Sequence, residues 1–210
     1  MELAKLAPWP IAPRSTRPIT SGLNNESYFV SADEGEYVLR VYRNTADATR
    51  VRDEHDLLGR LAMQELAFAV PSPVATREGD TIAVLETENG RRLATLFHRI
   101  PGEPAQQSVA AARLAGRALA QLDAALARLD RPVRAPGELR DVHPLVPDPF
   151  AALADVDLGT DRERIALLFE RVAAAHDALA TSLPRQIVHG DFSYGNVLVE
   201  NGVVQNAPGT

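Results

Sequence analysis

The residues best suited to chemistry lie in one short segment, Ile187–Val199. It contains His189, Asp191 and Asn196 in the spacing His-x-Asp-x-x-x-x-Asn, with apolar residues on both sides. The Asp191 carboxylate can accept a proton from a hydroxyl group, and the Asn196 amide oxygen can hold a metal ion that bridges phosphate groups. The pattern predicts a strand, a polar loop and a second strand, as in phosphoryl-transfer loops. A polar turn that only satisfies local backbone groups is the alternative.

Composition is that of an ordinary globular chain. The 210 residues suffice for one large domain or two small lobes. The net charge of −6, without any basic run, argues against a nucleic-acid partner. No apolar run is long enough to cross a membrane, and the absence of cysteine favours a reducing compartment. We therefore expect a cytoplasmic protein with neither a nucleic-acid nor a membrane partner.

The first hundred residues are expected to be rich in strands. The segments Ser27–Ser31 and Glu36–Tyr42 contain β-branched and aromatic residues, and Asp33-Glu34-Gly35 between them is a hairpin signal. Apolar spacing predicts a helix over residues 45–66. Turn residues within 81–100 predict a second hairpin, so this half positions its side chains mainly on a sheet.

After residue 100 the pattern becomes helical. The run Pro101-Gly102-Glu103-Pro104 predicts a hinge between two lobes. Ser108 is expected to cap an alanine-rich helix that runs to Asp130. Five prolines make residues 131–159 an irregular segment, and a capping box at Thr160 predicts a further helix.

The loop and this order of elements resemble the family of aminoglycoside phosphotransferases, choline kinases and type II homoserine kinases. Gly190, where protein kinases usually carry arginine, is similar to the small-molecule branch. The resemblance implies an α+β, bilobal protein-kinase-like fold. It implies a strand-rich nucleotide-binding lobe over residues 1–100, a hinge at 101–104 and a helical catalytic lobe over 105–210.

The same resemblance implies ATP-dependent phosphoryl transfer to a hydroxyl of a small molecule, with Mg²⁺ as the metal. The acceptor would be an amino alcohol, an amino acid or an aminoglycoside. Asp191 would be the catalytic base, His189 would brace the loop, and Asn196 would be a magnesium ligand. His55, His143 and His176 follow no partner pattern and are interpreted as surface or core histidines.

Nucleotide contacts are implied along the first lobe. The polar loop at residues 20–27 would cover the phosphates, because Gly, Ser and Asn let backbone N–H groups turn toward an anion. Arg40 takes the place of a phosphate-anchoring lysine, and Glu54 would be its partner. Two unpaired exposed charges are the alternative. The residues expected to bind nucleotide are Gly22, Asn24, Asn25, Ser27, Val38, Arg40, Glu54, Phe97, His98, Arg99 and Leu198.

One expected metal ligand does not match. The family carries an aspartate after the second strand, whereas residues 203–206 are Val-Val-Gln-Asn and no acidic residue follows Glu200. We therefore expect a C-terminally truncated family member with negligible turnover by itself. The alternatives are a catalytically inactive nucleotide-binding remnant or interaction module and, with less support, a protein kinase. The sequence indicates neither the acceptor nor the oligomeric state.

Overall fold

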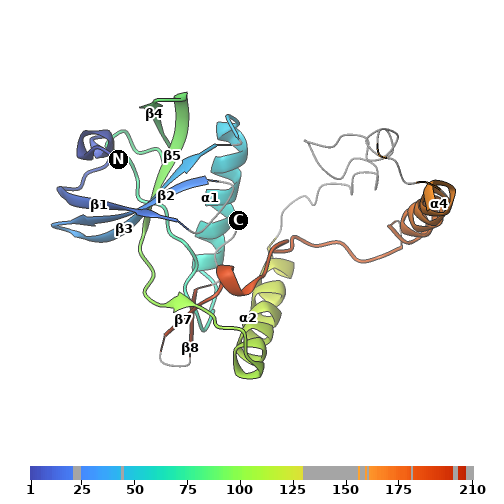
Figure 1. The fold of residues 1–210 in the computed structure, drawn as a ribbon. Coiled ribbons are helices and arrows are strands. Elements are labelled where there is room, and N and C mark those ends of the chain that lie inside the picture. The colour runs from blue at the N-terminus through green and yellow to red at the C-terminus, as the bar shows by residue number, and fades with distance from the viewer. Residues whose placement is uncertain are drawn as a thin grey trace. The chain divides into compact units, whose positions relative to one another are not determined.

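The chain forms two compact units, Met1–Leu129 with Val188–Thr210, and Asp130–Ile187. The computed structural model describes residues 1–20, 25–43, 45–129, 156, 159, 161–180, 182–200 and 203–206. The first unit contains both β-sheets and the loop with Asp191 (Figure 1). The lobe boundary predicted at residues 101–104 stays a prediction.

The larger sheet has five strands in the order β1-β2-β3-β5-β4, and all neighbours are antiparallel. These strands are β1 (Pro13–Ile19), β2 (Asn25–Ala32), β3 (Gly35–Tyr42), β4 (Ala83–Thr87) and β5 (Gly90–His98). Both predicted hairpins are confirmed. The two-residue turn between β2 and β3 pairs Ala32 with Gly35, which fixes the register of every later pair along the two strands.

One face of this sheet packs into the hydrophobic core. Val30, Leu39 and Leu96 are fully buried there with Trp9, which follows the short 3-10 helix η1 (Leu3–Leu6). Because successive strand residues point to opposite faces, the residues between them are displayed on the other side.

That other side is the pocket face, defined by a row of directly opposite residues across four strands. Arg17 pairs with Phe29, Phe29 with Val38, and Val38 with Phe97. Directly opposite side chains share a face, so these residues form one continuous strip. Arg40, two residues beyond Val38 on β3, lies on the same face.

Helix α1 (Ala48–Ala62) follows β3 and begins one residue after its N-cap, Asp47. The Asp47 carboxylate accepts hydrogen bonds from the N–H groups of Thr49 and Arg50 at 3.0 and 3.1 Å. The helix predicted over 45–66 is therefore correct in type but too long, because this cap stops it at the N-terminal side. Its buried residues are Val51, His55, Leu58 and Leu61.

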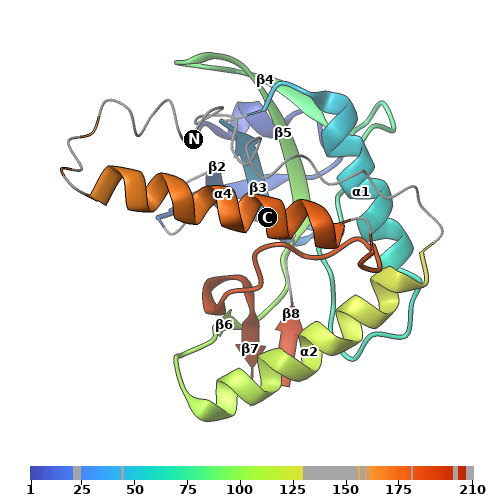
Figure 2. The ribbon, with the colours of Figure 1, turned by 90° about the vertical axis from the view of Figure 1, so that its right-hand side faces the viewer.

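A second, three-stranded sheet has the order β6-β7-β8. Its strands are β6 (Glu103–Pro104), β7 (Leu198–Glu200) and β8 (Val203–Asn206). Helix α2 (Val109–Ala127) contacts β8 and runs beside it in Figure 2. The Ser108 hydroxyl accepts from the Ala111 N–H at 3.1 Å, so the predicted N-cap is confirmed.

Gly102 allows β6 to lie against β7. Its φ of +113° is unfavourable for other residues, and a Cβ there would lie 3.3 Å from both the Leu198 Cβ and the Val199 carbonyl oxygen. The segment after the large sheet is thereby held against the strand that follows the Asp191 loop.

The strand expected just before the Asp191 loop is not present, and this prediction was wrong. Residues 187–189 have no paired strand in the described part of the chain, and Val188 is 61% exposed. β7 pairs with β6 on one side and β8 on the other, so its ladder positions are taken. An apolar pair alone does not make a strand without such a partner.

The second unit is described mainly through helix α4 (Asp161–Ala180), which confirms the further helix predicted behind Thr160. Thr160 itself lies outside the described residues, as does nearly all of the segment predicted to be irregular. None of the helices in the described residues is long and apolar enough to cross a membrane.

Candidate functional site

A cavity of about 390 Å³ lies within the first unit, between the pocket face, the segment after β5 and the end of the Asp191 loop. Pro71, Ile100 and Pro104 add apolar surface to it. Six of the residues expected to bind nucleotide line this cavity: Val38, Arg40, Phe97, His98, Arg99 and Leu198. The structure therefore brings together side chains that lie up to 160 positions apart in the sequence.

The other expected nucleotide contacts that the structure describes, Asn25, Ser27 and Glu54, are not among the residues that line the cavity. Ser27 is the direct cross-strand neighbour of Arg40, and Asn25 lies at the start of β2 opposite Tyr42. Gly22 and Asn24 lie outside the described residues. Their roles stay predictions.

Arg40 and Glu54 form the ion pair that the sequence predicted. The Arg40 Nη1 lies 3.7 Å from the Glu54 Oε1, and the two side chains are only 19% and 29% exposed. Burial raises the pKa of Glu54, while Arg40 and then Arg50 oppose that shift. The Arg40 guanidinium carbon also lies 5.2 Å from the centre of the Phe97 ring. These two charges are thus paired at the cavity wall rather than free on the surface.

Sequence reasoning missed Arg17 and Phe29, which also line the cavity. The guanidinium carbons of Arg17 and Arg99 lie 4.6 and 4.9 Å from the centre of the Phe29 ring. Such distances are within cation–π range. The signal was available, because a two-residue turn after Ala32 places Phe29 opposite Val38.

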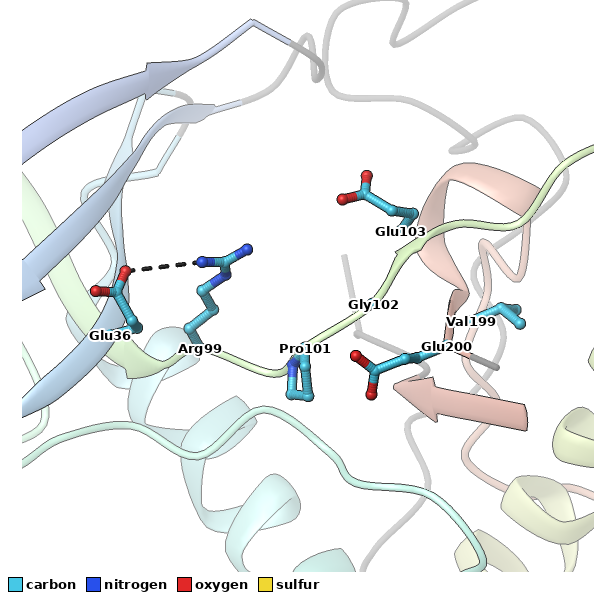
Figure 3. A pocket seen from close by; sticks show the side chains of 7 residues that line it. All are labelled: Glu36, Arg99, Pro101, Gly102, Glu103, Val199 and Glu200. Carbon is cyan, nitrogen blue, oxygen red and sulfur yellow. Dashed lines mark ion pairs between the residues drawn. The ribbon is translucent and has the colours of Figure 1, made fainter. Parts of the chain in front are cut away.

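A second pocket of about 530 Å³ adjoins the cavity and shares Arg99, Gly102 and Glu103 with it. Figure 3 shows Glu36 paired with Arg99 at one end, at 3.7 Å, and Glu103 and Glu200 at the other. This pocket is larger than the cavity, but Arg99 is the one predicted site residue among the described residues that line it, and His189, Asp191 and Asn196 do not.

The Asp191 loop is organised by its own three polar residues. The Asp191 N–H donates to the His189 Nδ1 at 3.2 Å. The Asn196 amide nitrogen donates to the Asp191 carbonyl at 2.8 Å and to its carboxylate at 3.0 Å. The short 3-10 helix η3 (Tyr194–Asn196) makes this five-residue approach possible. Gly190, with φ of +83°, supplies the turn that leads into it.

These contacts fit oxygen-based metal chemistry. Because the Asn196 nitrogen faces Asp191, its amide oxygen is directed elsewhere and can coordinate a hard cation. The described residues contain no cluster of three or more His, Cys, Asp or Glu that could hold a metal ion. A cation here would therefore need further oxygens from a bound phosphate group. Gly195 and Leu198, not Asp191 itself, carry this loop to the cavity.

Comparison with known proteins gives the family. The model of the phosphotransferase enzyme family matches residues 15–205, almost the whole chain. The chain belongs to this phosphotransferase family. The match includes both the cavity residues and the Asp191 loop, so the site described above lies within the region that defines the family.

Among relatives, a homoserine kinase from Phenylobacterium zucineum is 29% identical, over 98% of this chain and 62% of that protein. A homoserine kinase from Methylobacillus flagellatus is 27% identical, over 89% of this chain and 54% of that protein. The chain thus spans between half and two thirds of the length of the curated relatives it matches.

Solved structures show the same fold. A microcompartment-associated aminopropanol kinase superposes with a TM-score of 0.74 at 20% identity, over 98% of this chain and 67% of that chain. An amicoumacin kinase in complex with AMP-PNP and Ca²⁺ gives a TM-score of 0.69 at 15% identity, over 98% and 61%. The chain therefore has the α+β kinase-like fold that the sequence predicted.

Proposed function

We propose that this chain binds ATP with Mg²⁺ in the 390 Å³ cavity, as part of a kinase that phosphorylates a hydroxyl of a small molecule. The observation that carries the proposal is the convergence of predicted residues on one cavity, at whose wall Glu54 holds a charged arginine. A cavity of this size is in the range that small-molecule ligands occupy.

The base of the nucleotide would lie among apolar side chains at one side of the cavity. Val38 and Phe97 are directly paired on the sheet, and Leu198 approaches from β7. The backbone of His98 and Arg99 would offer the polar contacts. Flat apolar surfaces on both sides of a ring, with a few polar groups at its edge, are typical of cofactor sites.

The phosphates would lie toward Arg40. Its guanidinium can bind phosphate oxygens in pairs, and it lies against the Glu54 carboxylate and the Phe97 ring. The Asn196 amide oxygen would hold Mg²⁺ together with phosphate oxygens. When bound, the ion would neutralise negative charge on the transferred phosphoryl group.

In this proposal Asp191 would act as the base. It would take the proton of the acceptor hydroxyl as that oxygen bonds to the γ-phosphorus and the bond to the β-phosphate oxygen breaks, releasing ADP. Asn196 donates to this carboxylate and orients it. His189 accepts the Asp191 N–H and holds the backbone, so it is a positioning residue rather than a catalytic one.

For the acceptor we propose a compound with a hydroxyl and an amine. Support comes from the relatives named homoserine kinases and the neighbour named an aminopropanol kinase, whose substrates carry both groups. We also propose a cytoplasmic location, on the absence of cysteine. A nucleotide-binding module without catalysis is the second candidate, because the described residues offer a cation no acidic cluster.

Calorimetric titration of the chain with AMP-PNP and Mg²⁺ tests binding. We expect saturable binding that Arg40→Ala weakens about tenfold, as for a lost charge-assisted contact. Arg60→Ala is the matched control, because Arg60 also pairs with a carboxylate, on the exposed side of α1. A folded chain that binds no nucleotide would contradict the proposal.

ADP release with homoserine or aminopropanol as acceptor then separates the two candidates. Turnover that Asp191→Asn abolishes would establish the kinase. The same assay is repeated on a version of the chain extended to the length of the relatives. If both bind nucleotide but neither turns it over, the non-catalytic module is established.

A further inference from the structure

The first unit buries a polar network that the proposed chemistry does not use. Among the described residues, the buried polar or charged side chains are His55, Thr76 and Thr95. His55 is 5% exposed and Thr95 is fully buried. A buried polar group is costly unless it is hydrogen-bonded. Because hydrogen bonds require a particular geometry, such a network fixes the relative orientation of the elements it joins, which apolar packing does not.

His55 connects three elements through its two ring nitrogens. Its Nδ1 lies 2.6 Å from the Thr81 hydroxyl, just before β4, and its Nε2 lies 3.5 Å from the Thr95 hydroxyl on β5. The ring edge faces Phe97, with centroids 5.7 Å apart and planes at 89°. The side chain thus fixes one rotational setting of helix α1 against the sheet.

This network touches both members of the Arg40–Glu54 pair. Glu54 immediately precedes His55 on α1, and Thr95 is the direct cross-strand partner of Arg40. Phe97 lies near both the His55 ring and the Arg40 guanidinium. A rotation of α1 would therefore carry the Glu54 carboxylate away from Arg40.

We propose that His55 is a positioning residue for nucleotide phosphates: by bonding Thr81 and Thr95 it holds Glu54 against Arg40. This inference rests on the proposed function, because it concerns the phosphate end of the same site. The sequence pattern leads to the interpretation of His55 as a plain core or surface residue. The proposal assigns this buried histidine a specific role.

The network needs a neutral imidazole. The positive charges of Arg40 on β3 and Arg52 on α1 lower the pKa of the ring, and the negative charge of Asp80 before β4 opposes them. Burial, followed by Arg40, lowers the pKa of His55 to about 4. At neutral pH the ring can therefore accept one hydroxyl hydrogen bond and donate the other.

The test compares a ligand that carries phosphates, for which we propose a contact with Arg40, with one that carries none. Dissociation constants for AMP-PNP with Mg²⁺ and for adenosine are measured on the 210-residue chain by calorimetry. We expect His55→Leu and Thr95→Val to weaken AMP-PNP about tenfold and to change adenosine less than about twofold. Thr76→Val, which removes a buried hydroxyl elsewhere, is the control and should change neither.

A double-mutant cycle adds a readout that a purely structural role would not move. In the Arg40→Ala background, His55→Leu should cause no further loss of AMP-PNP affinity, because its effect acts through Arg40. His55→Gln keeps an amide donor and acceptor and should recover part of the affinity.

Equal losses for AMP-PNP and adenosine, additive effects in the cycle, or no change in either ligand would each overturn the inference. If His55→Leu does not fold, Thr95→Val alone decides, because it removes one hydroxyl and conserves volume. A wild-type chain that binds adenosine but gains nothing from the phosphates would instead refute the proposed function, and the inference with it.

Discussion

At the scale of single residues, Arg40 is the side chain that we propose as a phosphate contact, at a position where the family resemblance implies a lysine. Its planar guanidinium meets a carboxylate 3.7 Å away and an aromatic ring 5.2 Å away. An ammonium group is a compact point charge without a plane that can lie against a ring. We therefore expect the surroundings of position 40 to favour arginine over lysine.

The Arg40→Lys variant should bind AMP-PNP with Mg²⁺ about threefold to tenfold more weakly, since the lysine loses the stacked contact and the bidentate reach. Calorimetry measures the affinity, with Arg60→Lys as the control on the exposed side of α1. Equal or tighter binding by the lysine variant would show that charge alone matters at this position.

His55 should make the stability of the first unit depend on pH. Its pKa is lowered to about 4 in the folded protein, so the unfolded chain takes up a proton first as the pH falls. Its contribution is thus present above pH 6.5 and is lost toward pH 4, amounting to about 2 kcal/mol between pH 7 and pH 5. Urea unfolding at several pH values measures this loss.

Glu54 changes in the opposite direction, because its pKa is raised and its burial cost disappears on acidification. The wild type is therefore compared with His55→Gln. Both proteins contain Glu54, so its effect on the pH dependence cancels in the comparison. The two unfolding profiles should converge as the pH falls from 7 to 5. Parallel profiles would contradict the assignment of a neutral buried imidazole.

At the scale of elements, helix α1 places Glu54 and His55, and its first turn depends on Asp47. Asp47→Ala removes the acceptor for two backbone N–H groups and should cost about 1 kcal/mol in the free energy of unfolding. Asp56→Ala, in an exposed ion pair on the same helix, should cost less than about 0.5 kcal/mol. Similar losses for both variants would show that the cap contributes nothing.

The elements also show what sequence patterns could and could not predict. Hairpins at residues 33–35 and around 88–90 carry turn residues with a direct conformational meaning, and both were found. The length of α1 was overestimated mainly because Leu66 continues the apolar spacing beyond the end of the helix at Ala62. The strand at 187–188 failed because pairing depends on partners that a single segment does not reveal.

At the scale of the whole molecule, the cavity belongs to one compact unit although its residues come from distant parts of the chain. Family resemblance supplied Arg40, Glu54 and Phe97, because each has a counterpart in the motif. It could not supply Arg17 and Phe29, which depend on the register across β1, β2 and β3. Phe29 could have been placed from the turn after Ala32, whereas Arg17 depends on how β1 pairs with β2.

Ligand binding should therefore protect one unit and not the other. With AMP-PNP at a hundred times its dissociation constant, amides of β2, β3 and β5 should gain protection equivalent to about 2.7 kcal/mol. Amides of α4 should not change, since no residue of 161–180 lines the cavity. Hydrogen exchange measures both, and an equal gain in α4 would show that the two units open together.

The burial of Trp9 has a spectroscopic consequence. It is the single tryptophan of the sequence, fully buried on the core face of the large sheet, opposite the face that lines the cavity. Its fluorescence should be blue-shifted in the folded protein and should move to the red only when that sheet opens. Emission from one native indole thus reports the integrity of the sheet independently of whether the cavity is filled.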